Sequence, residues 1–105
     1  PKPYVGFLCT TTGGMASIVY HVGFKTTGIS SAHAASGMYN ITIPAHPSGA
    51  NFLTIVSPYT TSTSNQTPIA WPTSYAQTST TCFVYCRTTI GTILSDGNLF
   101  FYTVP

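Results

Sequence analysis

Charge is the property that this chain of 105 residues has least of. Lys, Arg, Asp and Glu make up 4% of the sequence, against about 25% in a typical soluble domain. The net charge of +2 comes from Lys2, Lys25 and Arg87 against a single carboxylate, Asp96. Without a cluster of basic residues the chain has little with which to bind phosphates, so the sequence argues against a nucleic-acid partner.

The groups needed for catalysis and metal binding are also scarce. Glycoside hydrolysis usually requires two carboxylates, and this chain has one. His21, His33 and His46 are far apart and form no HExxH motif, no serine lies in a Gly-x-Ser-x-Gly elbow, and no CxxC pair is present. We therefore expect no enzymatic activity, no cofactor and no metal site. The alternative is a metal held by His33 or His46 where three chains meet on a threefold axis.

Two local motifs have simple interpretations. His46 lies in a proline-rich turn, and we expect it to hydrogen-bond the backbone of that loop. Asn40-Ile41-Thr42 and Asn65-Gln66-Thr67 match the N-glycosylation acceptor pattern, which matters only in a eukaryotic secretory route.

Long apolar runs are absent as well. No stretch approaches the 18 consecutive apolar residues of a transmembrane helix, so we expect no membrane insertion. The sequence starts at Pro1-Lys2-Pro3 with neither a methionine nor an apolar signal segment. We expect one domain over residues 1–105, cut from a longer protein, with residues 1–3 as the end of a preceding stalk or linker.

The three cysteines, Cys9, Cys82 and Cys86, are an odd number. In an extended strand Cys82 and Cys86 would lie about 13 Å apart, which is beyond the reach of a disulfide. Buried free thiols that pack as small apolar groups are the simpler interpretation. A bridge from Cys9 to Cys82 or to Cys86 is the alternative, and the sequence leaves the choice open.

Hydroxyl groups are abundant. Thr occurs 19 times and Ser 11 times, while the hydrophobic content is an ordinary 43%. Thr is β-branched, so it fits a pleated strand while it presents a hydroxyl group to water. The composition therefore predicts an all-β protein with neutral solvent faces. An uncharged surface with this apolar content also favours self-association, so we expect an oligomer.

Strand patterns and turn residues predict an antiparallel β-sandwich of jelly-roll type with seven or eight strands and no amphipathic helix. Seven strands are expected at residues 4–12, 15–25, 38–43, 52–57, 82–88, 90–94 and 99–104. Gly13-Gly14 predicts a hairpin between the first two, and Ser95-Asp96-Gly97-Asn98 predicts a hairpin with a type I′ turn.

Three of these strands give expectations about their faces. In residues 15–25 the alternation places one set of side chains on one side: Ala16, Ile18, Tyr20, Val22 and Phe24. In residues 38–43 the buried face of a half-buried strand is formed by Tyr39, Ile41 and Ile43. Residues 52–57 are apolar at nearly every position, which is typical of a strand at the centre of a sheet.

Two segments have no strong period. Residues 26–37 predict a loop or an edge strand, with a short helical turn at residues 32–35 as the alternative. Residues 59–81 are polar, twice interrupted by proline and longer than an ordinary connection. They predict either a functional loop or a short strand at residues 69–71.

The order of these elements resembles a known family. The chain has an aromatic and apolar strand, then His46-Pro47-Ser48-Gly49-Ala50-Asn51, then an apolar strand that runs to Pro58, and it ends in Asp96-Gly97-Asn98-Leu99-Phe100-Phe101-Tyr102-Thr103-Val104. This order resembles the distal head domains of bacteriophage and related viral tail fibres, over about residues 39–58 and the last ten residues. The resemblance implies a sandwich similar to the C1q and tumour-necrosis-factor jelly roll. It also implies a homotrimer at the tip of a fibre or spike on the virion, outside the host cell.

Such a head would attach the virion to a host cell-surface receptor, either a glycan or a protein. The candidate ligand-binding residues place aromatic rings beside neutral donors and acceptors, which suits a sugar: Trp71, Tyr75, Tyr59, Asn65 and Gln66. The alternative for Trp71 is packing in the core, with its indole N–H bonded to a carbonyl. Two other functions stay open, namely a trimerisation or capping module without an external ligand and a free-standing carbohydrate-binding module.

Overall fold

The computed structural model describes residues 2–12, 15–49, 51–59, 68–90 and 92–104, and within them it contains nine strands and no helix. The strands are β1 (Gly6–Thr12), β2 (Met15–Val22), β3 (Ser30–Ala35), β4 (Met38–Pro44), β5 (Thr54–Tyr59), β6 (Pro68–Gln77), β7 (Thr81–Ile90), β8 (Ile93–Leu94) and β9 (Asn98–Thr103). No helix in this part of the chain is long and apolar enough to span a membrane.

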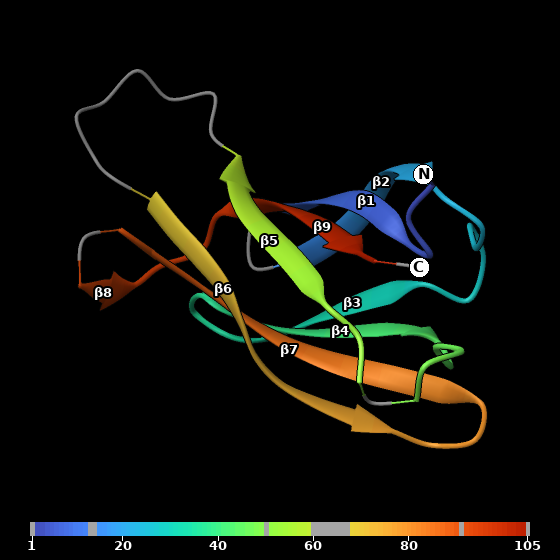
Figure 1. The fold of residues 1–105 in the computed structure, drawn as a ribbon. Helices are drawn as coiled ribbons and strands as arrows, with labels where there is room; N and C mark the ends of the chain where they lie inside the picture. The colour runs from blue at the N-terminus through green and yellow to red at the C-terminus, as the bar shows by residue number, and fades with distance from the viewer. Residues whose placement is uncertain (1, 13–14, 50, 60–67, 91, 105) are drawn as a thin grey trace.

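The strands form two antiparallel sheets that pack face to face (Figure 1). Sheet I has the order β2-β1-β9-β5. Sheet II has the order β3-β4-β7-β6, and the two-residue β8 pairs with the end of β7. The chain passes from one sheet to the other after β2, β4, β5 and β8, so it wraps around the core instead of running up and down one sheet. The predicted all-β antiparallel sandwich is confirmed, with nine strands where seven or eight were expected.

The core lies between the sheets and is built from alternate residues of the central strands. β4 contributes Tyr39, Ile41 and Ile43, all fully buried as predicted, and β7 contributes Cys82, Val84 and Cys86. From sheet I the Phe7 and Phe101 rings stack with their centroids 4.7 Å apart. The three cysteines are buried free thiols, which confirms the simpler of the two predictions.

The two strands expected at the centre of the molecule differ from their predicted positions. β4 is central in sheet II, between β3 and β7, whereas β5 is an edge strand of sheet I and pairs only with β9 among the described residues. The apolar run in β5 does not mean burial on both faces, because Ile55 is 58% exposed. The prediction of a central strand at residues 52–57 was therefore wrong.

Of the two predictions for residues 59–81, the strand at residues 69–71 is confirmed, and it is longer than expected because β6 is a ten-residue strand. Its prolines are tolerated because β6 is the edge of sheet II, where a missing N–H does not break a ladder on both sides. Pro72 lies beside a register shift, since Pro72 pairs with Cys86 but Ser74 pairs with the next residue of β7, Tyr85. Thr73 is the extra residue of this bulge.

β2 follows the predicted alternation only in its first half. Ala16 and Ile18 pack against the core, but Tyr20, Val22 and Phe24 are exposed. The cause is a bulge opposite β1, where Leu8 pairs with Val19 but Gly6 pairs with Val22. Tyr20 takes up the extra length with a left-handed backbone, φ +55°, which is unusual for a bulky residue.

The segment around Asp96 does not form the predicted hairpin. β8 pairs with β7, whereas β9 pairs with β1 and β5, so residues 95–97 cross from sheet II to sheet I. Gly97 does not have the positive φ that a type I′ turn requires. The hairpin of β1 and β2 is confirmed by their pairing, although Gly13 and Gly14 lie outside the described residues. β3 confirms an edge strand within residues 26–37.

Candidate functional site

Trp71 and Tyr75 lie on opposite faces of β6. Trp71 pairs with Arg87, which lies between the buried residues Cys86 and Thr88 of β7, so the Trp71 side chain is on the outer face of sheet II. Tyr75 pairs with the fully buried Val84 and faces the core. Residues four apart in a regular strand share a face, but the extra residue Thr73 reverses the alternation between them.

Tyr75 is part of the packing between the sheets. Its ring meets Phe52 edge to face at 4.9 Å, and Phe52 stacks on His46 at 4.4 Å. His46 is buried and bonded at both nitrogens, with Nε2 donating to the Val104 carbonyl at 2.8 Å and Nδ1 accepting from the Ser48 N–H at 3.1 Å. The predicted backbone bonding of His46 is confirmed, and Tyr75 has a structural position.

The remaining candidate residues are not brought to Trp71. Tyr59 is in β5 of sheet I, 38% exposed, with its ring against Phe100 at 5.1 Å. Asn65 and Gln66 lie outside the described residues. The described residues therefore do not gather the predicted set into one site, because its two exposed members, Trp71 and Tyr59, lie on different sheets.

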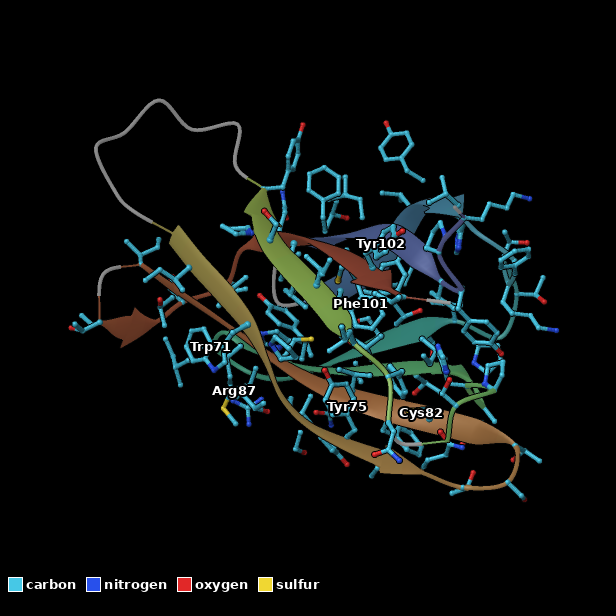
Figure 2. The ribbon with its side chains drawn as sticks, viewed as in Figure 1. Trp71, Tyr75, Cys82, Arg87, Phe101 and Tyr102 are labelled. Carbon is cyan, nitrogen blue, oxygen red and sulfur yellow. The ribbon has the colours of Figure 1, made fainter. Side chains whose placement is uncertain are left out.

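Trp71 is 38% exposed and stands in a cross-strand row with Arg87 and Met38 (Figure 2). Arg87 is central in this row because β7 lies between β4 and β6. Its Nη1 donates to the Cys86 carbonyl at 3.1 Å, which holds the guanidinium close to the strand. The half-exposed indole of Trp71 therefore lies next to the cation of Arg87, and Arg87 is held by a hydrogen bond to its own strand, β7.

The next row on the same face is polar. Asn40 of β4 pairs with Tyr85 of β7, and Tyr85 pairs with Ser74 of β6. The bulge that re-aims this part of β6 is held by Thr73, whose hydroxyl donates to the Tyr85 carbonyl at 3.0 Å. We name the two rows together the Trp71 face: Met38, Asn40, Trp71, Ser74, Tyr85 and Arg87.

The Trp71 face combines two aromatic rings, an amide, hydroxyl groups and one cation. It lies on three hydrogen-bonded strands, so its side chains keep fixed positions relative to one another. Aromatic rings suit the C–H faces of sugars, and amide and hydroxyl groups suit their hydroxyls. Arg87 is the one formal charge in the two rows.

The sequence carried a signal for the residues that were missed. Cys82, Val84 and Cys86 alternate in a strand, so the residues between them must share the other face: Phe83, Tyr85 and Arg87. The pairing of β7 with residues 68–77 was not foreseen because that segment was predicted as either a loop or a strand of only three residues. The Asn40 sequon lies on this face, and the Asn65 sequon falls outside the described residues.

A second polar cluster fixes the crossover around Asp96. His33 Nε2 donates to Asp96 Oδ1 at 2.7 Å, and the Gly37 N–H donates to the same oxygen at 2.8 Å. The Gly37 hydrogen bond, followed by the contact with His33, holds the pKa of Asp96 below its usual value. These bonds tie the crossover to the turn between β3 and β4, so the carboxylate has a structural role.

The same crossover is held from inside by Tyr39. Its hydroxyl accepts the Gly97 N–H at 2.9 Å and donates to the Gly97 carbonyl at 3.1 Å. The Thr88 hydroxyl has one hydrogen, which it donates to the Ser95 carbonyl at 2.7 Å. Its oxygen lies 3.4 Å from the Tyr39 oxygen. In the part of the chain that the structure describes, no group of three His, Cys, Asp or Glu residues could hold a metal ion.

Comparisons were made with protein-family models, with curated proteins and with solved structures. None of the three finds a match for this chain.

Proposed function

We propose that this chain is the receptor-binding tip of a viral tail fibre or spike, a homotrimer that attaches the virion to a host cell-surface receptor. The Trp71 face is the receptor-binding surface. The observation that carries the proposal is the half-exposed Trp71 in line with Arg87 and Met38, on a rigid sheet instead of a loop. The resemblance of residues 39–58 and the C-terminal segment to fibre heads supplies the biological setting.

A neutral glycan is the receptor class that the Trp71 face fits best. The indole offers an apolar platform, while Asn40, Ser74 and Tyr85 supply amide and hydroxyl groups in the adjacent row. Trp, Tyr and Arg are also the residues that most often dominate binding energy at interfaces. A flat site of this size binds one ligand weakly, and three copies on one head would raise the avidity without any new contact.

The second candidate is a trimerisation or capping module with no external ligand. The observation that favours it is the uncharged, apolar outer face of sheet I, because a surface of that kind suits contact between copies of the chain. The two candidates differ in what the loss of Trp71 does. In the first it removes ligand binding, and in the second it has no functional effect.

Binding to immobilised neutral glycans and to whole bacterial cells tests the proposal. Trp71→Ala and Arg87→Ala should each weaken binding tenfold or more, which corresponds to about 1.4 kcal/mol, with an unchanged circular dichroism spectrum. Phe24→Ala, which removes an exposed ring remote from β6, is the matched control and should bind as the unaltered chain does. Full binding by both Trp71→Ala and Arg87→Ala would refute the assignment of the Trp71 face as the receptor-binding surface. A monomer that binds glycans through Trp71 would favour a free-standing carbohydrate-binding module.

A further inference from the structure

The outer face of sheet I carries two mainly apolar rows of side chains. Its rows follow the strand pairing, so that Val22, Gly6, Tyr102 and Ile55 form one row. Val19, Leu8, Phe100 and Ser57 form the next. Leu8 is buried although it is on the outer face, since its neighbours cover it. Met15 and Tyr59 both lie beyond the Leu8 row, toward the same end of the sheet, on its two opposite edge strands.

The exposed part of this surface is comparable in area with the largest apolar patch of a typical monomer. Five side chains dominate it, each between 38% and 73% exposed: Met15, Val22, Ile55, Tyr59 and Phe100. At about 150–250 Å² for a large side chain that is fully accessible, the exposed apolar area is on the order of 600 Å². The largest patch of a typical monomer is about 300–600 Å², and each partner in a standard interface contributes about 800 Å². The face therefore supplies most of one side of a stable interface.

The chemistry of the face decides what can cover it. The four strands of sheet I contain no Lys, Arg, Asp or Glu, including the edge strands β2 and β5, where charges usually prevent association. A partner must therefore be apolar and uncharged, and further copies of this chain meet this condition when three such faces turn toward a common threefold axis. The outer face of sheet II does not meet it, because self-association there would bury Arg87 without a carboxylate to pair with it.

We infer that copies of this chain join through the outer face of sheet I, centred on Phe100 and Ile55. The inference rests on the proposed trimer and assigns its contact surface. It also separates two roles, since sheet I faces sister chains and leaves the Trp71 face of sheet II open to a receptor. Figure 2 places Tyr102 on the opposite sheet from Trp71 and Arg87.

The test is the absolute mass of the chain in solution, by light scattering on a sizing column over a range of concentrations. Phe100→Ser removes the central exposed ring, and Ser57→Lys adds a charge beside it while keeping every apolar group. Both should shift the mass toward the 11.1 kDa of one chain. Ile69→Ser, an exposed isoleucine on the edge of sheet II, and Ser79→Lys, in the turn between β6 and β7, are the matched controls and should leave the mass unchanged.

Three results overturn the inference and are distinguishable. A monomeric unaltered chain removes both the trimer and its interface. A trimer that survives Phe100→Ser and Ser57→Lys, with circular dichroism showing both variants folded, leaves the trimer but removes this face. A trimer that Ile69→Ser dissociates moves the interface to sheet II. Glycan binding by the monomeric variants would be weaker only through lost avidity, so failure of the Trp71 assignment is measured independently.

Discussion

Removing the Tyr39 hydroxyl should destabilise the fold strongly for a change of one oxygen atom. Tyr39 is fully buried, and its hydroxyl both accepts the Gly97 N–H and donates to the Gly97 carbonyl. Tyr39→Phe keeps the ring and its packing but leaves the Gly97 N–H without an acceptor, whereas the Gly97 carbonyl keeps the Thr11 hydroxyl as a donor at 3.1 Å. An unpaired buried polar group costs about 1–3 kcal/mol, so we expect a loss of about 2 kcal/mol in the free energy of unfolding.

The measurement is urea unfolding followed by circular dichroism, at one fixed protein concentration because association stabilises the folded chain. A thermal scan should show a melting temperature lower by about 10 °C, at roughly 4–8 °C per kcal/mol for a domain near this size. Tyr85→Phe, on the outer face of sheet II, is the control and should change stability by less than about 0.5 kcal/mol. A Tyr39→Phe loss as small as that of the control would refute the claim that this hydroxyl pins the crossover.

Three further predictions follow from strain, pKa and burial. Tyr20→Gly should raise the free energy of unfolding by roughly 0.5–1 kcal/mol in the same urea assay, because it relieves a left-handed backbone at a side chain that is 78% exposed; a net loss would contradict this. Asp96 has a lowered pKa, so its contacts stabilise the fold above the ordinary carboxyl pKa and are lost as the pH falls through the folded value. In the Asp96→Asn variant the free energy of unfolding, measured with urea at several pH values, should therefore fall less as the pH is lowered. An unchanged dependence on pH would contradict this prediction. Burial raises the pKa of Cys86 to about 12, so iodoacetamide at neutral pH should leave the folded chain unmodified by mass spectrometry and should label three thiols only after unfolding: Cys9, Cys82 and Cys86.

The sequence predicted the parts of the fold where alternation continues without interruption. β4 and β7 have every second residue buried, and both strands and their inner faces followed from the pattern. The sandwich itself followed from composition and turn residues. Central and edge positions did not follow, because an apolar run such as that of β5 can be exposed at an edge.

The errors in β2 and β6 share one physical cause, which is a bulge in the strand. At Tyr20 and at Thr73 one extra residue reverses the faces that a period of two assigns. The prediction that Trp71 and Tyr75 contact one ligand assumed that both rings lie on the same face of the strand. The bulge at Thr73 places them on opposite faces. A bulge depends on the register of the partner strand, so residues 15–25 or 68–77 read alone could not reveal it.

The position of β1 ties the completion of sheet I to a strand that is far away in the sequence. β1 has one neighbour, β2, that follows at once, but its other neighbour is β9, with Gly6 paired to Tyr102 and Cys9 to Leu99. At about 5–20 residues per second, a ribosome makes β9 on the order of 5–20 s after β1. During that interval the open edge of β1 exposes N–H and C=O groups that nothing in the same chain can yet satisfy. Neighbouring nascent chains could pair there, so docking of β9 closes the interval in which misassembly competes with folding.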